Sequence, residues 1–556
     1  MKTTKVFLGV AGLGMLMLTS CNGKLGEITA DNFTVTPNPL EANAGKVPAT
    51  IDGRFPVKYM KKKATVVVTP ELRYAGGVAT GQSAAFQGEK AVGNNQVISY
   101  KLGGNYTMRN VFNYIPEMQQ SELYLTFDAR IGNKVFNVPA VKVADGVLAT
   151  SQLVYRTVNS ANTCVAADSY QRIIAQKQDA QIKYLINQAK VRTSELETTT
   201  IQDFVKVLRE IKEDQKGYAL NNIEISAYAS PEGKFDFNQK LAGQREASAK
   251  EYVDGQLKNI ELESNVDTKY TAEDWEGFQE LVAASNIQDK DIILRVLSMY
   301  QDPEEREAQI KNMSVAFKEL ADEILPELRR ARLTINYNLI GRTDAEIQQQ
   351  FTEDASKLSL EELLYAASLT ESAQAKQQIF ETTTRLFPND YRAYNGLAQV
   401  AYANGDLAAA KSALAKAGDK TEANANAALI AISEGQLDKA ESLLGKALTA
   451  ANYNEVLGNL QIARGNYAQA AQALKGVNTN SAALANILNK DYSAAKQILA
   501  NVKNADGLTS YLKAIVGVRT GDIAGAKAAL QQAVALDPSL AKYAAKDLEL
   551  ILAGVK

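Results

Sequence analysis

Residues 405–417 read Gly-Asp-Leu-Ala-Ala-Ala-Lys-Ser-Ala-Leu-Ala-Lys-Ala, and this stretch decides the fold of the carboxyl-terminal region. The pattern returns every 30 residues, because Gly435-Gln436-Leu437 and Gly465-Asn466-Tyr467 each precede an alanine and a leucine at the same offsets. A further copy begins at Gly521. Such a fixed period is typical of stacked helical hairpins. We therefore expect an all-α solenoid over residues 359–556.

These copies resemble tetratricopeptide repeats (TPR), in which large and small residues let two helices cross closely. The resemblance implies a concave groove suited to an extended peptide or a helix of a protein partner. The period is shorter than the usual ~34 residues, so shortened turns or helices are expected. The predicted repeat-core residues are Leu397, Ala398, Gly405, Ala410, Gly435, Ala440, Gly465, Ala470, Gly521 and Ala526.

The amino terminus has the order of a secretory signal peptide. Lys2 and Lys5 precede an apolar run over residues 6–18, and Leu18-Thr19-Ser20-Cys21 follows. This ending resembles a bacterial lipobox, which implies removal of residues 1–20 and attachment of diacylglycerol and a palmitate-like acyl chain at Cys21. The alternatives are an ordinary signal peptide with an incidental cysteine, or an uncleaved anchor. The run is shorter than the ~20 residues of a membrane-spanning helix.

The composition narrows the possible activities. The chain contains no histidine, which excludes His-based triads and disfavours zinc sites. With 61 Lys and Arg against 63 Asp and Glu, the charge gives no reason to expect nucleic-acid binding. Cys164 has no second cysteine available if Cys21 is lipidated, and a small buried residue is the simplest interpretation. No nucleophile with a base, no cofactor motif and no metal site is found.

Residues 24–150 have the pattern of β-structure. Short β-branched or alternating runs, such as 64–74 and 123–130, are separated by Gly, Pro and Asn. This spacing predicts an immunoglobulin-like β-sandwich. It carries no candidate catalytic residue, so we expect a spacer or docking module.

Residues 158–343 predict an α+β domain. Alternating patterns predict strands at 182–186, 222–229, 266–270 and 332–340, and helical spacing covers 194–211 and 238–257. A helical insertion is expected over about 272–328. A short segment, residues 230–237, connects the second predicted strand to the second predicted helix.

The sequence from Ile223 to Gly233, followed by Asn238, Leu241 and Arg245, resembles the OmpA carboxyl-terminal family. In that family an aspartate and an arginine bind the diaminopimelate of peptidoglycan, and the resemblance carries this role to Arg245. Ser230 stands at the aspartate position, which weakens the inference, and Glu232 is a candidate for the missing charge. Ser230, Glu232, Asn238 and Arg245 are therefore possible peptidoglycan or ligand contacts. The alternative for Arg245 is an ion pair on the helix surface with Glu246 or Glu232.

Together these features predict a non-catalytic outer-membrane lipoprotein that acts as a scaffold. The OmpA-like domain would dock to the envelope, and the TPR-like array would bind a protein partner. Residues 22–27 lack the acidic cluster that resembles a surface-export signal, which favours the periplasmic face. The alternative function is a peptidoglycan-binding tether between the outer membrane and the cell wall. An envelope hydrolase is a third possibility, for which no site is found.

Overall fold

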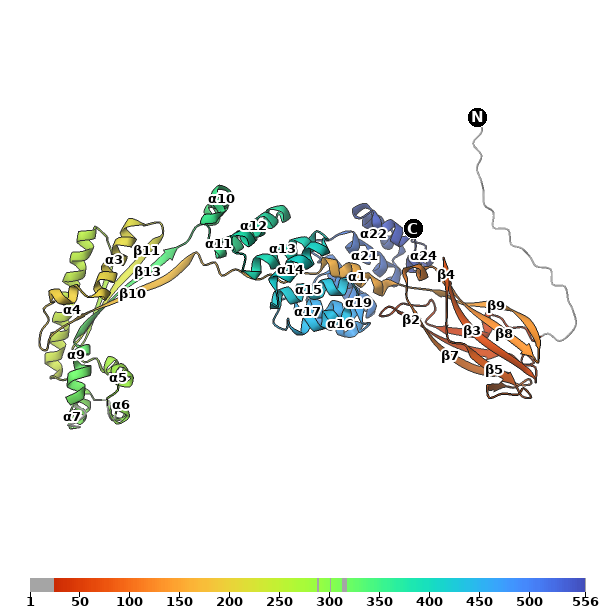
Figure 1. Ribbon diagram of the computed structural model, residues 1–556, viewed down its shortest axis with the longest axis horizontal. Coiled ribbons are helices and arrows are strands. Elements are labelled where there is room, and N and C mark those ends of the chain that lie inside the picture. The colour runs from red at the N-terminus through yellow and green to blue at the C-terminus, as the bar shows by residue number, and fades with distance from the viewer. Residues whose placement is uncertain (1–24, 288–289, 301, 313–317, 556) are drawn as a thin grey trace, which may run out of the picture. The chain divides into compact units, whose positions relative to one another are not determined.

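The computed structural model describes residues 25–287, 290–300, 302–312 and 318–555 (Figure 1). The proposed lipidation site, Cys21, lies outside these residues. The chain divides into two compact units. One contains the chain up to Ala167 together with the chain from Thr370, and the other contains Asp168–Leu369. The amino-terminal β-region and the carboxyl-terminal helices therefore belong to one unit.

The β-region consists of two sheets that share one core. A three-stranded sheet has the order β1-β2-β7, and the larger sheet has the order β6-β5-β3-β8-β9, with β4 added to β3. Burial alternates along β2, β3, β7 and β8, as expected for strands with one face in a core. The strands are β1 (Phe33–Thr36), β2 (Lys46–Phe55), β3 (Ala64–Tyr74), β4 (Gly77–Thr80), β5 (Ala84–Gly88), β6 (Gln96–Ile98), β7 (Gly104–Asn113), β8 (Ser121–Ile131) and β9 (Lys134–Gly146). Ile51 and Phe112 from one sheet meet Val66 and Leu123 from the other in this core.

The carboxyl-terminal region is a TPR-like array of helical hairpins. The paired helices are α13 (Tyr391–Ala403) with α14 (Leu407–Ala417), α15 (Thr421–Ser433) with α16 (Leu437–Gly445), α17 (Tyr453–Ala463) with α18 (Tyr467–Ala473), α19 (Asn480–Leu488) with α20 (Tyr492–Ala500), and α21 (Gly507–Thr520) with α22 (Ile523–Leu536). The array also includes α12 (Ala373–Leu386), α23 (Ser539–Ala544) and α24 (Leu548–Leu552).

The repeated glycines form the tight turns inside the hairpins. Gly405, Gly435, Gly465 and Gly521 have φ values of 77°, 72°, 79° and 80°, a left-handed conformation that a side chain disfavours. Lys490 holds the same position in the degraded copy, with φ of 64°. In several copies the next residue caps the second helix.

For example, the Asp406 carboxylate accepts a hydrogen bond from the Ala409 amide. The alanines at the fixed offset, Ala410, Ala440, Ala470 and Ala526, have no exposed surface, which allows the paired helices to approach closely. Ala398 is buried and Leu397 is partly exposed.

A segment between the β-region and the second unit packs on the array. We call residues 150–167 the strap. It contains two 3₁₀ turns, Thr150–Leu153 and Val158–Ser160, which flank the short helix α1 (Val154–Thr157), and it continues without regular structure from Ala161. The strap contacts α13, α15, α17 and α19, the first helices of successive hairpins (Figure 1). We call the face that these helices present to the strap the inner face.

The strap explains why the structure sets domain boundaries at 168 and 370 in place of the predicted 158 and 359. Val158, Ala161 and Cys164 are buried in the core of the repeats, so this stretch belongs with the array. Helix α11 (Leu360–Ser368), predicted to open the repeats, lies in the other unit. The apolar residues of the strap show no periodic pattern, so the sequence contains no local indication that the strap packs on the repeats.

The second unit contains a four-stranded sheet in the order β10-β13-β11-β12, in which only β11 and β12 pair in parallel. The strands are β10 (Ile173–Lys183), β11 (Tyr218–Tyr228), β12 (Val266–Thr271) and β13 (Arg330–Ile340). Helices α3 (Thr199–Glu213) and α4 (Phe235–Ile260) pack on the sheet. Ile182, Ile225 and Leu333 from the strands meet Phe204 and Val253 from the helices in one core.

The predicted strand 182–186 overlaps β10 only at Ile182 and Lys183, because β10 begins at Ile173 and stops at Lys183. The chain turns through Asn187, whose φ of 55° is incompatible with a strand. Ile186 therefore leaves the sheet.

The insertion before β13 is helical and has a small core of its own. It contains α5 (Trp275–Ala284), α6 (Lys290–Met299), α7 (Pro303–Asn312), a π-helical turn (Leu320–Ile324) and α9 (Leu325–Leu328). Phe278, Val282, Leu320 and Leu328 form part of its core. The short helix α2 (Thr193–Leu196) precedes α3, and α10 (Asp344–Asp354) follows β13. Within the described ranges, no helix combines the length and the apolar character needed to cross a membrane.

Candidate functional site

The four predicted ligand contacts line one cavity of the second unit. Its volume is about 400 Å³, and it lies where the chain passes from β11 into α4. Its lining residues are Ile186, Asn187, Ser230, Glu232, Gly233, Phe237, Asn238, Leu241 and Arg245. The strand–turn–helix connection brings Ser230 and Glu232 opposite Arg245, which lies three helical turns into α4 on the side that faces the sheet.

Arg245 is buried and is held by main-chain carbonyl groups. Its side chain is among the largest that are fully buried, with 1% exposure. Nε donates to Gln188 O over 3.0 Å, Nη1 to Tyr228 O over 2.8 Å, and Nη2 to Leu185 O over 3.2 Å. The alternative of a surface ion pair is therefore wrong, because the turn after β10 covers this face of α4.

None of the described carboxylates forms an ion pair with Arg245. Burial lowers the pKa of its guanidinium to about 10, because the loss of hydration outweighs the opposing influence of the Glu232 carboxylate. Three of the five N–H groups of the guanidinium donate to carbonyl oxygens, and Arg245 is one of the residues that line the cavity. A buried cation of this kind is suited to an anionic ligand such as a carboxylate.

Glu232 is already paired. Its carboxylate accepts hydrogen bonds from Arg329 Nε over 3.0 Å and Nη2 over 3.1 Å, and Ser230 Oγ donates to Oε1 over 2.8 Å. The bidentate arrangement satisfies its charge. Glu232 therefore does not replace the missing aspartate as a free partner for an ammonium group.

Asn238 shapes the turn. Its Nδ2 donates to Ser230 O over 3.2 Å and to Gly233 O over 2.9 Å, so it fixes residues 230–233 against α4. Arg329, Ile186 and Phe237 were not predicted from the sequence to take part in this site. Ile186 and Phe237 are apolar side chains that line the cavity and are 53% and 47% exposed. The one feature of the sequence that marks Arg329 is its place directly before Arg330, the first residue of the last strand.

The inner face of the array is the second place where polar side chains gather. Asn395 and Asn426 lie on α13 and α15, and both reach the strap at Cys164. Glu455 on α17 reaches Asn162. The inner face of the array therefore holds a segment of the chain itself.

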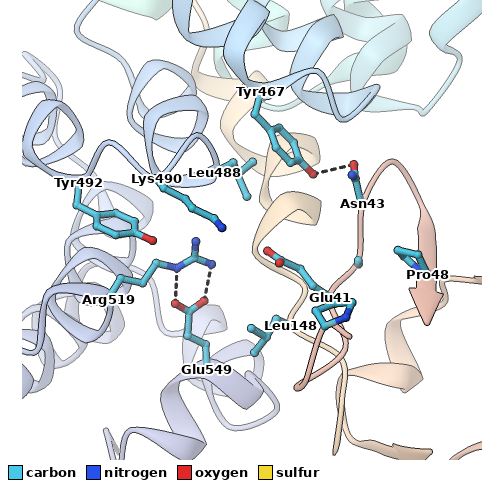
Figure 2. A pocket seen from close by; sticks show the side chains of 12 residues that line it. Glu41, Asn43, Pro48, Leu148, Tyr467, Leu488, Lys490, Tyr492, Arg519 and Glu549 are labelled. Atoms are coloured by element: carbon cyan, nitrogen blue, oxygen red, sulfur yellow. Dashed lines mark hydrogen bonds and ion pairs between the residues drawn. The ribbon is translucent and has the colours of Figure 1, made fainter. Parts of the chain in front are cut away.

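A second cavity, of about 530 Å³, lies where the β-region meets the repeats (Figure 2). Arg519 Nε and Nη2 bind Glu549 over 2.5 and 3.0 Å, and Thr150 Oγ1 donates to Glu549 over 2.7 Å. Tyr467 donates its hydroxyl to Asn43 Oδ1 over 3.0 Å. These bonds join the strap and a loop of the β-region to the repeats, so this cavity is part of a structural junction.

Metal binding receives no support from the described residues, among which no cluster of three or more Cys, Asp or Glu side chains could hold an ion.

No protein-family model and no curated protein matches this sequence. Among solved structures, the Cut9–Hcn1 hetero-tetramer of the APC/C is similar over 55% of this chain and 70% of that chain, with 14% identity and a TM-score of 0.27. Yeast Tom70 is similar over 65% of this chain and 83% of its own, with 13% identity and a TM-score of 0.25. Scores this low leave the function to be argued from the chain's own residues.

Proposed function

We propose that this protein is a non-catalytic, lipid-anchored scaffold of the bacterial envelope. In this proposal Cys21 carries the lipid at the periplasmic face of the outer membrane. The second unit is an OmpA-like domain that docks to the envelope, and the TPR-like array binds a protein partner. The observation that carries the proposal is the inner face of the array, where Asn395, Asn426 and Glu455 hold an extended protein segment through its main chain.

The chemistry of this face supports protein binding. Side-chain amides donate to and accept from main-chain groups, which every protein segment carries, so part of the affinity does not depend on a particular side chain. The repeats bury small residues, and Asn395 on α13 and Asn426 on α15 present their side-chain amides to the strap.

The experiment is photo-crosslinking in native envelopes. A photoreactive residue at position 399, where Gln399 lies half-buried at the inner face, should give one intermolecular adduct in stoichiometric yield. The matched control is position 92, because Val92 is fully exposed on the β-region. Equal labelling from both positions, or none from position 399, contradicts partner binding by the array.

Lipid anchoring is tested separately. The full chain should partition into the detergent phase after extraction, and Cys21→Ser should move it to the aqueous phase. Unchanged partitioning of the variant contradicts anchoring through Cys21.

A second function, a tether to the cell wall, is favoured by Arg245. This buried cation lines an open cavity without a carboxylate partner among the described residues, and peptidoglycan carries carboxylates. The full chain should co-sediment with purified sacculi. Phe237→Asp places a repelling charge in the cavity without removing any bond of Arg245, and it should abolish binding. Phe235→Asp is the matched control, because Phe235 is exposed on the same helix outside the cavity lining. Equal binding by both variants contradicts the site.

A further inference from the structure

The last part of the strap, residues 161–167, lies on the inner face as an extended segment without regular structure. The array binds Cys164 through the main-chain groups of that residue. Its carbonyl oxygen accepts from Asn395 Nδ2 over 2.9 Å and from Asn426 Nδ2 over 3.0 Å, and its amide donates to Asn426 Oδ1 over 2.7 Å. One asparagine therefore binds both main-chain groups of one residue, as a neighbouring strand would.

Asn162 is held in a comparable way. Glu455 Oε1 accepts from its amide over 3.1 Å and Oε2 accepts from its side-chain Nδ2 over 2.9 Å, while Asn452 Nδ2 donates to its carbonyl over 2.8 Å. Glu455 is a buried carboxylate, and these two N–H groups are its hydrogen-bond donors from the strap. Hydrogen bonds to a charged group are stronger than neutral ones.

The two halves of the strap are held differently. Leu153, Val154 and Val158 in the helical half are at most 1% exposed and belong to the core of the repeats. In the half that follows, Cys164 is buried in a small space, whereas Val165 is 67% exposed. The helical half is therefore fixed by apolar burial, and the extended half is fixed mainly by hydrogen bonds.

We propose that residues 161–167 are an exchangeable internal ligand of a peptide-binding site on the inner face, and that the partner inserts an extended segment in their place. The proposal rests on the proposed function, because it names how the array takes its partner. The segment needs an asparagine-like amide two positions before a small residue, since Glu455 requires two N–H donors and little space surrounds Cys164. The helical half of the strap stays bound during the exchange.

Competition within the chain sets the conditions for exchange. A ligand tethered by a few residues has an effective concentration of roughly millimolar. A free segment with the same contacts therefore binds only after this internal competitor is overcome. Weakening the internal segment alone should tighten binding of the same segment added from outside.

The test uses the purified full chain with Cys21→Ser, so that Cys164 is its only thiol. The probe is a fluorescent peptide of residues 159–167 in which Cys164→Ala removes its thiol. Asn162→Ala in the chain removes one bond to Glu455 and should tighten peptide binding about tenfold. The matched control is Asn159→Ala, because Asn159 is equally exposed and its side chain bonds only to Tyr155 O within the strap. The control should bind the peptide as the parent chain does.

The rate of Cys164 modification by a soluble thiol reagent gives a second measurement. Saturating peptide should raise this rate at least tenfold by displacing the internal segment, and Asn162→Ala should raise it without peptide. If the rate does not respond to peptide, or if no chain binds the peptide, the segment is a fixed part of the core and the proposal is overturned. Failure to find a partner by crosslinking at position 399 contradicts the proposed function instead, and leaves the peptide result interpretable.

Discussion

Replacing Asn426 with alanine should destabilise the first unit and leave the second unit unchanged. Asn426 is 3% exposed, and its amide bonds to Cys164 N, Cys164 O and Asn395 Oδ1 over 2.7, 3.0 and 2.9 Å. Each bond contributes roughly 0.5–1.5 kcal/mol, and the buried Cys164 amide loses its acceptor at a cost of roughly 1–3 kcal/mol. The expected loss is about 3–4 kcal/mol of unfolding free energy.

The chain provides one optical signal for the second unit alone and one to which the array contributes strongly. The single tryptophan, Trp275, lies in the second unit, whereas the helices of the array supply much of the far-ultraviolet circular dichroism. In urea, Asn426→Ala should lower the midpoint of the dichroism transition by about 1 M, taking a slope of about 3 kcal/mol/M. The midpoint followed by tryptophan fluorescence should stay the same.

The matched control is Asn486→Ala. Asn486 is also a buried asparagine on a first helix, at 9% exposure, but its amide donates only to Ala482 O of its own helix. We expect a loss of about 1 kcal/mol for this variant. Equal midpoints for the two variants would refute the argument that the array holds the strap through its main chain.

Three further predictions concern the same unit. Lys490→Gly should raise the free energy of unfolding, measured by urea titration, by about 0.5–1 kcal/mol. The reason is that Lys490 has a positive φ of 64°, which glycine adopts without strain. Gly405→Lys should have the opposite effect. Arg519→Ala should lower the free energy of unfolding by about 3–5 kcal/mol, because it leaves the Glu549 carboxylate, which is 7% exposed, without its cation. A loss below about 1 kcal/mol would contradict this role. Burial raises the pKa of Glu455 above 4.5, so its contribution to stability is greatest below that pH and declines as the pH rises through the raised pKa. The difference in unfolding free energy between the parent chain and Glu455→Gln should therefore fall as the pH rises above about 4.5, and a constant difference would exclude this explanation.

The repeat array shows what a local signal can predict. A glycine every 30 residues marks the turn of a hairpin because only the left-handed conformation closes it, and an alanine at a fixed offset marks the close contact of two helices. The turn and the helix contact each involve only residues of one or two adjacent repeats, so a local sequence pattern is enough to predict them. The order of strands and helices in the second unit could be predicted for the same reason, although the predicted bounds of β10 were wrong at both ends.

The candidate cavity could be predicted only in part. Ser230, Glu232, Asn238 and Arg245 come from one strand–turn–helix segment, and the structure brings them to one cavity. The partners that decide their chemistry come from elsewhere. Arg329, almost one hundred residues later in the chain, neutralises Glu232, and a turn after β10 supplies carbonyl groups to Arg245.

The sequence by itself determined the local elements of this protein: its helical hairpins, its β-rich amino-terminal region and the segment that contains Arg245. Only the tertiary structure decided what each binding face meets. Residues 150–167 carry no periodic pattern, yet they fill the inner face of an array whose helices begin more than two hundred residues later. Periodicity records how a segment packs with its neighbours in sequence, whereas the extended half of the strap is held mainly by hydrogen bonds, several of them to its main chain, which every residue type presents alike.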